Sequence, residues 1–175
     1  MSEEVTIIIP HFSAEILVDC LESLYEHTET PIRVIVVDDG PDAPSIRRAR
    51  EQFPQIEVMR NYSNLGFSAS CNRGLEATQS PYAVLLNDDT RVTAGWLNPL
   101  ISAAHTDPDL AACQPKLKSA IDPEMFDYGG AAGGLIDSLG YTFCRGRILD
   151  HIEKDTGQYD RQVPLFWASV LSLQV

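Results

Sequence analysis

The sequence predicts an α/β fold in which a mostly parallel central sheet is covered by helices on both faces. Strand-like apolar runs alternate with helix-like segments along most of the chain, and the connections between them are short. Such βαβ alternation favours parallel neighbouring strands. The run Ala83–Leu86 carries four apolar residues in succession, which is typical of a strand that is buried on both faces.

Composition and charge narrow the class of protein. The 175 residues have the length of one domain, and contents of 44% hydrophobic and 22% charged residues are those of a globular chain. A net charge of −12 excludes nucleic acid as a partner, because no basic stripe is present to neutralise phosphates.

No apolar run reaches the roughly 20 residues of a membrane span. The acidic start Met1–Glu4 lacks the features of a signal peptide, so we expect a cytoplasmic protein. The four widely spaced cysteines are expected to be free thiols.

The first half of the chain gives clear element signals. Val5–Ile9 is a β-branched run that stops at Pro10, so it predicts the first strand. Ser13 can cap a helix over about 14–27, whose apolar residues recur at helical spacing. Arg33–Val37 predicts the second strand. A polar helix over about 43–52 and a third strand over 56–59 follow.

The second half continues the alternation and then changes character. A helix is predicted over 68–78, before the central strand 83–86, and another helix opens at Thr93–Trp96. A further strand is predicted over 110–117. Residues 122–150 form a glycine-rich tract, which is more often a mobile loop or hairpin than a second domain.

Paired acids follow two of the predicted strands. Asp38-Asp39 ends the second strand, and Asn87-Asp88-Asp89 ends the central one. The carboxyl ends of parallel strands share one edge of the sheet, where α/β proteins bind ligands. Neighbouring carboxylates repel each other unless a cation shares the site, and a hard divalent ion that bridges to a phosphate meets that demand. The alternative is that both motifs are turns or helix caps.

A glycine before a predicted helix adds to this interpretation. Gly66 precedes the helix over 68–78, at a position where backbone can approach a phosphate closely. An ordinary helix-capping turn without a ligand is the alternative.

Taken together, these motifs resemble the family-2 inverting glycosyltransferases, which have the nucleotide-diphospho-sugar transferase (GT-A) fold, and especially their rhamnosyltransferase-like branch. The resemblance covers nearly the whole chain. It rests on the order and spacing of five segments, which are Ile8–Phe12, Val36–Gly40, Asn64–Phe67, Asn72–Leu75 and Leu86–Thr90.

The resemblance implies transfer of a sugar from a nucleotide-diphosphate sugar to an acceptor hydroxyl with inversion. It implies that Pro10, Phe12 and Asp39 hold the nucleoside base, that Asp88 holds the ribose, and that Asp89 binds Mg²⁺ or Mn²⁺. Gly66 and Asn72 belong to its nucleotide-binding motif. The donor would carry UDP, dTDP or GDP, and the acceptor would be a carbohydrate or a lipid-linked sugar of polysaccharide biosynthesis.

The sequence departs from the family pattern in two ways. Phe12 and Ser13 stand where the family has Tyr and Asn, and Asn87 replaces the first acid of the metal motif. The family's general base lies beyond the segment that Val163–Val170 resembles, so we assign no catalytic residue and expect one domain over 1–175, truncated before the acceptor region. The apolar run Leu171–Val175 would then be an uncovered edge that favours a homodimer; peripheral membrane association is compatible with a lipid-linked acceptor.

Other classes of protein share parts of this pattern. A non-catalytic sugar-nucleotide-binding module differs from the enzyme only in turnover. A receiver-type signalling domain needs an acceptor Asp after the third strand, where Met59-Arg60-Asn61 has none. A nucleotidyltransferase would carry a glycine-rich loop with Arg and Lys after the first strand, and Pro10–Ser13 is not such a loop.

Overall fold

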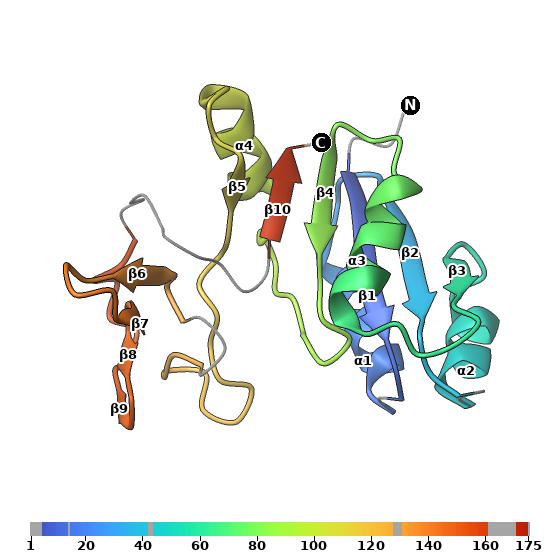
Figure 1. Cartoon of the computed structure of the whole chain (residues 1–175), viewed down its shortest axis with the longest axis horizontal. Coiled ribbons are helices and arrows are strands. Elements are labelled where there is room, and N and C mark those ends of the chain that lie inside the picture. The colour runs from blue at the N-terminus through green and yellow to red at the C-terminus, as the bar shows by residue number, and fades with distance from the viewer. Residues whose placement is uncertain (1–4, 14, 42–43, 128–130, 161–170, 175) are drawn as a thin grey trace. The chain divides into compact units, whose positions relative to one another are not determined.

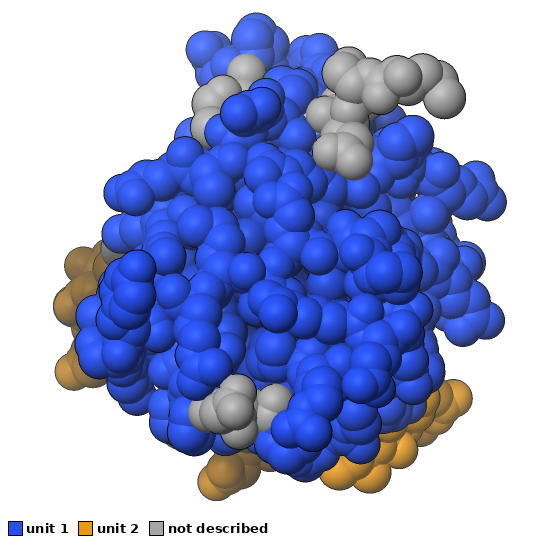
Figure 2. Space-filling view, turned by 90° about the vertical axis from the view of Figure 1, so that its right-hand side faces the viewer, with its two compact units in different colours: residues 1–112, 171–175 blue, residues 113–170 orange. Residues whose placement is uncertain are grey.

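The computed structural model describes residues 5–13, 15–41, 44–127, 131–160 and 171–174. The chain separates into two compact units, one of residues 1–112 and 171–175 and one of residues 113–170, which Figure 2 shows in different colours. We predicted one domain over residues 1–175. No helix in the described ranges is long and apolar enough to cross a bilayer.

The first unit is built on the predicted parallel sheet (Figure 1). Its sheet has the order β3-β2-β1-β4-β10-β5, in which β1 pairs in parallel with β2 and β4, and β2 pairs in parallel with β3. The strands are β1 (Val5–His11), β2 (Ile32–Asp38), β3 (Glu57–Arg60), β4 (Tyr82–Leu85), β5 (Ala112–Cys113) and β10 (Leu171–Gln174). The helices are α1 (Leu17–His27), α2 (Pro44–Gln52), α3 (Phe67–Glu76) and α4 (Asn98–Thr106).

The centre of the core is β1, in which every residue is buried. Ile8 packs with Ile35, Val37 and Ala83, on the face that α3 covers in Figure 1. A Cβ on Gly74 of α3 would lie 2.3 Å from Cγ2 of Ile8, so the missing side chain brings this helix close to the sheet. Ile7 and Ile9 point to the opposite face and are also fully buried, so the prediction of a sheet covered on both faces is confirmed.

Two helices begin later than predicted. Ser13 does not cap α1, which starts at Leu17 after Ile16, without a side-chain cap. The fourth helix starts at Asn98 rather than near Thr93, because Gly95 has a φ of +75° and breaks the helical path. Pro99 lies in its first turn, where proline lacks only a hydrogen bond that no helix makes there. The strand predicted over 110–117 is limited to Ala112–Cys113.

The C-terminal run does not remain as an uncovered edge. Leu171–Gln174 forms β10, which pairs antiparallel with β4 and lies between β4 and β5 in the sheet. Its backbone groups are therefore paired on both sides, which removes the exposed edge that would recruit another chain. The segment Val163–Val170, which we compared with the acceptor-proximal part of the family, lies outside the described residues.

The second unit contains the glycine-rich tract. A four-stranded antiparallel sheet in the order β6-β7-β8-β9 forms from β6 (Gly134–Ile136), β7 (Thr142–Cys144), β8 (Arg147–Ile148) and β9 (His151–Ile152). Its small core consists of Phe126, Ala131 and Ala132, with Cys144 and Tyr159 packed against them. Much of the tract is thus a chain of hairpins, one of the two forms that we predicted for it.

Candidate functional site

The carboxyl ends of β1, β2 and β4 meet at one edge of the sheet in the first unit. His11 ends β1 and is in register with Asp38, which ends β2. The N–H of Asp39 donates to the His11 carbonyl at 2.8 Å, and the His11 imidazole bonds to Asp88 beyond β4. The predicted convergence of the two acid pairs is therefore present, and His11 is the residue that joins them.

Asp39 anchors the loop before α3. Its Oδ1 accepts hydrogen bonds from the Asn61 amide at 2.7 Å and from the Leu65 N–H at 2.8 Å, while Oδ2 accepts one from the Gly66 N–H at 2.8 Å. The residue is 7% exposed. Burial opposes ionisation of Asp39, but these hydrogen bonds and one from Ser70 together lower its pKa. The carboxyl group is therefore an anion that fixes the position of the loop.

Gly40 follows this carboxylate and lies against the backbone of Phe12. A Cβ at Gly40 would be 1.7 Å from the Phe12 carbonyl oxygen, so only glycine allows the two segments to approach. Phe12 is 49% exposed, and Pro10 is buried in β1. The close approach thus sets the backbone of Phe12 against the residue that follows Asp39.

Gly66 takes the backbone conformation that its position requires. Its φ is +83°, and its N–H donates to Asn64 as well as to Asp39. That N–H is therefore engaged within the protein, and what Gly66 offers to a ligand is open space, since nothing lies within 4 Å of the position of a Cβ. Asn72 is on the exposed side of α3, and among the described residues its side chain makes no hydrogen bond to the acids.

The second acid pair lies on the turn that follows β4. Thr90 N–H donates to the Asn87 carbonyl at 3.2 Å, which closes the turn. Asp88 accepts from His11 Nδ1 at 2.7 Å through Oδ2, and its side chain is 18% exposed. Asp89 is exposed. The two interpretations of this motif, as a turn and as a ligand site, are therefore compatible, because the carboxylates lie on the turn itself.

Cys20 of α1 lies beneath this turn. Its thiol is 3.6 Å from the Asn87 carbonyl oxygen, and the residue is 1% exposed. Burial, together with the negative charges of Asp88 and Asp89, raises the pKa of Cys20 to about 12. The thiol therefore stays protonated at neutral pH.

We expect Cys20 to be the last cysteine that iodoacetamide modifies in the folded protein at pH 8. A pKa near 12 leaves roughly one thiolate in ten thousand, and the thiolate is the reactive form. Peptide mass spectrometry over time would follow each cysteine, with the half-buried Cys113 as the internal comparison. The difference should vanish in denaturant. Equal rates for Cys20 and Cys113 in the native protein would contradict the buried position of the Cys20 thiol.

The sequence interpretation stopped the first strand at Pro10 and gave His11 no role in the site. His11 is the last residue of β1 and is 1% exposed. Its Nε2 lies 2.9 Å from the Ser45 hydroxyl, in the first turn of α2. The available signal was its place next to Pro10 at the end of a fully buried strand, where an inward polar residue needs partners.

Three acidic residues of the second unit precede, in the sequence, the segment that resembles the acceptor-proximal part of the family. Asp155 is paired with Lys116 at 2.8 Å and Lys118 at 3.3 Å, and the hydrogen bond from Lys116 is the main cause that lowers the pKa of Asp155 to about 2. Asp160 also pairs with Lys116, and Glu153 accepts from the Tyr159 hydroxyl at 2.9 Å. A carboxylate with so low a pKa is a weak base, so Asp155 serves to stabilise this unit.

The turn after β4 offers the right donors for a hard divalent ion. Among the described residues, no three or more His, Cys, Asp or Glu side chains gather into a complete metal site. Mg²⁺ is usually held by one or two carboxylates, with substrate phosphates and water completing its shell. The exposed Asp89, next to Asp88, has the oxygen ligands that such an ion takes, and the ion's remaining ligands would come from phosphate and water.

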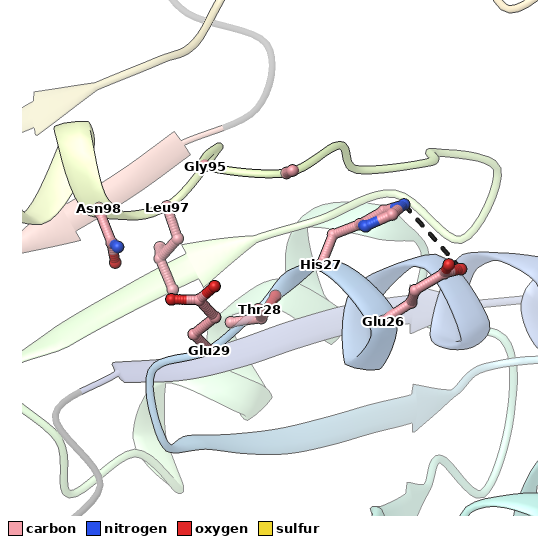
Figure 3. A pocket seen from close by; sticks show the side chains of 8 residues that line it. Glu26, His27, Thr28, Glu29, Gly95, Leu97 and Asn98 are labelled. Atoms are coloured by element: carbon pink, nitrogen blue, oxygen red, sulfur yellow. Dashed lines mark ion pairs between the residues drawn. The ribbon is translucent and has the colours of Figure 1, made fainter.

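Two surface cavities lie away from this turn. One, of about 120 Å³, is shown in Figure 3 between the end of α1, at His27 to Glu29, and the segment from Gly95 to Asn98. Another, of about 360 Å³, is lined by Asp38 and by Arg47, Arg50 and Arg60. Neither contains Asp39, Asp88 or Asp89, although Asp38 of the first acid pair lines the second.

Solved structures share this fold. A mannosyltransferase from Pyrobaculum calidifontis, PcManGT, in complex with GDP-Man and Mn²⁺, matches 68% of the chain with a TM-score of 0.58 and 24% identity, over 36% of its own length. S. aureus TarS in complex with UDP-GlcNAc matches 66% of the chain with a TM-score of 0.59 and 17% identity, over 34% of its own length. These likenesses confirm the predicted GT-A fold.

Sequence relatives carry glycosyltransferase names. The uncharacterized glycosyltransferase YibD of Escherichia coli is 28% identical over 117 residues, which are 64% of this chain and 34% of that protein. An N-acetylglucosaminyl-diphospho-decaprenol L-rhamnosyltransferase of Mycobacterium tuberculosis is 25% identical over 122 residues, which are 63% of this chain and 39% of that protein. The matched region thus spans about a third of the length of these relatives. The pattern of the family described as Glycosyl transferase family 2 matches residues 6–132, so the chain belongs to that family.

Proposed function

We propose that this chain binds a nucleotide-diphosphate sugar at the carboxyl edge of its sheet and serves metal-assisted, inverting transfer of the sugar to an acceptor hydroxyl. The observation that carries the proposal is the meeting of Asp39 and Asp88 around His11, with the exposed Asp89 beside them. Carboxylates that are held at a parallel-strand edge in this way form a site for a polar ligand.

In this proposal, particular residues bind each part of the donor. Phe12 and Pro10 pack on the base, and Asp39 fixes the loop that lies against its edge. Asp88 has a free Oδ1 that can accept from a ribose hydroxyl, since only its Oδ2 is engaged by the described residues. Gly66 leaves space at the start of α3, and Asn72 lies on the exposed side of that helix.

Asp89 is the metal ligand in this proposal. A bound Mg²⁺ or Mn²⁺ would neutralise the charge that develops on the departing diphosphate. In an inverting transfer, the acceptor oxygen forms a bond to the anomeric carbon while the bond from that carbon to the diphosphate oxygen breaks. The acceptor proton goes to a base that we do not assign. Because the metal ion would neutralise the charge of the diphosphate at the site, the negative net charge of the chain does not prevent an anionic donor from binding.

The similar proteins support the choice of ligand. PcManGT was solved with GDP-Man and Mn²⁺, and TarS was solved with UDP-GlcNAc. The mycobacterial relative carries diphospho-decaprenol in its name. For this chain we propose a UDP, dTDP or GDP sugar as the donor and a carbohydrate or lipid-linked acceptor.

Calorimetric titration with UDP, dTDP and GDP, each with Mn²⁺ and with EDTA, tests the proposal. We expect one of the three to bind, and to bind more tightly with Mn²⁺, because the ion joins Asp89 to the diphosphate. Equal affinity with Mn²⁺ and with EDTA would reject the metal ligand. If none of the three bound under either condition, the function as a whole would be wrong.

A further inference from the structure

A buried hydrogen-bonded chain runs from the proposed donor site to the first turn of α2. His11 lies at its centre, with Nδ1 at 2.7 Å from Asp88 Oδ2 and Nε2 at 2.9 Å from the Ser45 hydroxyl. The His11 side chain is fully buried, Ser45 is 0% exposed, and the Asp88 side chain is 18% exposed. The chain is therefore closed to water at the serine end and opens to solvent only at the carboxylate.

The direction of these hydrogen bonds follows from the donors and acceptors that Asp88, His11 and Ser45 carry. An ionised carboxylate only accepts hydrogen bonds, so the proton between His11 and Asp88 belongs to Nδ1. The Ser45 hydroxyl can rotate either to donate to Nε2 or to accept from it, so Nε2 also has a partner. Both ring nitrogens are satisfied, which fixes the orientation of the ring.

The geometry points to His11 as a positioning residue that holds Asp88 in the orientation needed to bind a ribose hydroxyl, with Ser45 holding His11. This inference rests on the proposed function for the role of Asp88. Because His11 takes Oδ2, the rotamer of Asp88 is set before any ligand arrives and Oδ1 is left for it. A preorganised acceptor of this kind does not have to be ordered when the ligand binds.

The backbone of His11 gives it a second link to the site. Its carbonyl accepts from the Asp39 N–H at 2.8 Å. His11 therefore contacts both Asp88, which is assigned to the ribose, and Asp39, which begins the segment assigned to the base. A shift of His11 would therefore move both parts of the site. Substitutions must change the ring while they keep this backbone position.

Three variants separate positioning from mere packing. His11→Asn keeps an amide donor near the place of Nδ1 but loses Ser45, whereas His11→Leu fills the space without any donor. Ser45→Ala removes only the outer contact. The readout is the ratio of affinities for a nucleoside diphosphate and for its 2′-deoxy and 3′-deoxy forms, measured with the nucleotide that the wild type binds. General destabilisation does not change this ratio.

We expect the wild type to lose about ten-fold in affinity for the deoxy form that lacks the contacted hydroxyl, which corresponds to one good hydrogen bond to a charged group. His11→Leu should reduce that ratio to about two-fold or less, while His11→Asn keeps most of it and Ser45→Ala lies between. Full discrimination in folded His11→Leu would overturn the inference. If the leucine variant did not fold, unchanged discrimination in Ser45→Ala would overturn it instead.

A spectroscopic readout does not depend on nucleotide binding. In ¹⁵N-edited spectra of the unliganded wild type, we expect the His11 ring to carry a fixed proton on Nδ1, with altered ring shifts in Ser45→Ala and in Asp88→Asn. A ring that exchanged freely between tautomers would overturn the inference by itself. A wild type with the expected proton on Nδ1 that bound no nucleoside diphosphate would instead reject the proposed function and leave His11 as the residue that orients Asp88.

Discussion

Asp89→Ala is expected to remove the Mn²⁺-dependent part of nucleotide binding. Asp89 is exposed on the turn that follows β4, and among the described residues no cluster of three or more His, Cys, Asp or Glu side chains could hold the ion without it. An ion that bridges a carboxylate to a diphosphate offsets the repulsion between the two anions, and we expect its loss to lower the affinity roughly 100-fold, which is about 2.8 kcal/mol. Titration of the variant with Mn²⁺ and with EDTA should give the same, weaker dissociation constant.

The control for this substitution is another exposed aspartate. Asp109→Ala, on the connection between α4 and β5, removes one negative charge away from the turn and should keep the metal dependence of the parent. Circular dichroism and thermal unfolding of both variants should match the wild type, since an exposed carboxylate contributes little to folding. An Asp89→Ala protein whose affinity still rose with Mn²⁺ would show that the ion is held elsewhere.

Local patterns in the sequence predicted the parallel sheet and the meeting of its acids. The β-branched runs of β1 and β2 indicate buried strands. Parallel strands bring their carboxyl ends to one edge of the sheet, independently of the conformation of the loops. For that reason Asp39 and Asp88 were predicted as neighbours, although Asp88 follows β4 and Asp39 follows β2. What the pattern missed was His11, because a histidine after Pro10 fits a turn as well as it fits the end of a strand.

The remaining differences depend on contacts that local patterns do not encode. The start of α4 is set by the positive φ of Gly95. The backbone conformation of a glycine cannot be predicted from the apolar pattern around it. The insertion of β10 beside β4 is a pairing between distant segments of the chain. The anchoring of the loop by Asp39 uses the N–H groups of Leu65 and Gly66, which every residue except proline would offer.

That anchoring leads to the second large effect, which we expect from Asp39→Asn. The amide would face the N–H of Gly66 or Leu65 with its own NH₂, so two donors would meet and one hydrogen bond to the carboxylate would be lost. A hydrogen bond to a charged group contributes about 1.5–3 kcal/mol, and the weakened bond from Asn61 adds to the loss. We expect a loss of about 2–4 kcal/mol in the free energy of unfolding at pH 7, together with weaker nucleotide binding with or without Mn²⁺.

The pH dependence of that loss separates the charge from the shape of the side chain. The hydrogen bonds to Asp39 outweigh its burial and lower its pKa below the ordinary value of 3.8. The charged form therefore stabilises the fold above the unfolded-state pKa, and this contribution is lost as the pH falls through the lower folded-state value. Wild type and Asp39→Asn should differ most near neutral pH and converge as the pH falls below about 4.

Urea unfolding of both proteins between pH 7 and pH 3 measures this difference, and Asp109→Asn provides the matched loss of an exposed charge. The control should follow the wild type throughout, because no described hydrogen bond depends on the Asp109 carboxylate. A difference between wild type and Asp39→Asn that stayed constant down to pH 3 would mean that the side chain stabilises the loop by shape alone. The anionic anchor would then be wrong, and with it the reason for placing Asp39 against the edge of a nucleoside base.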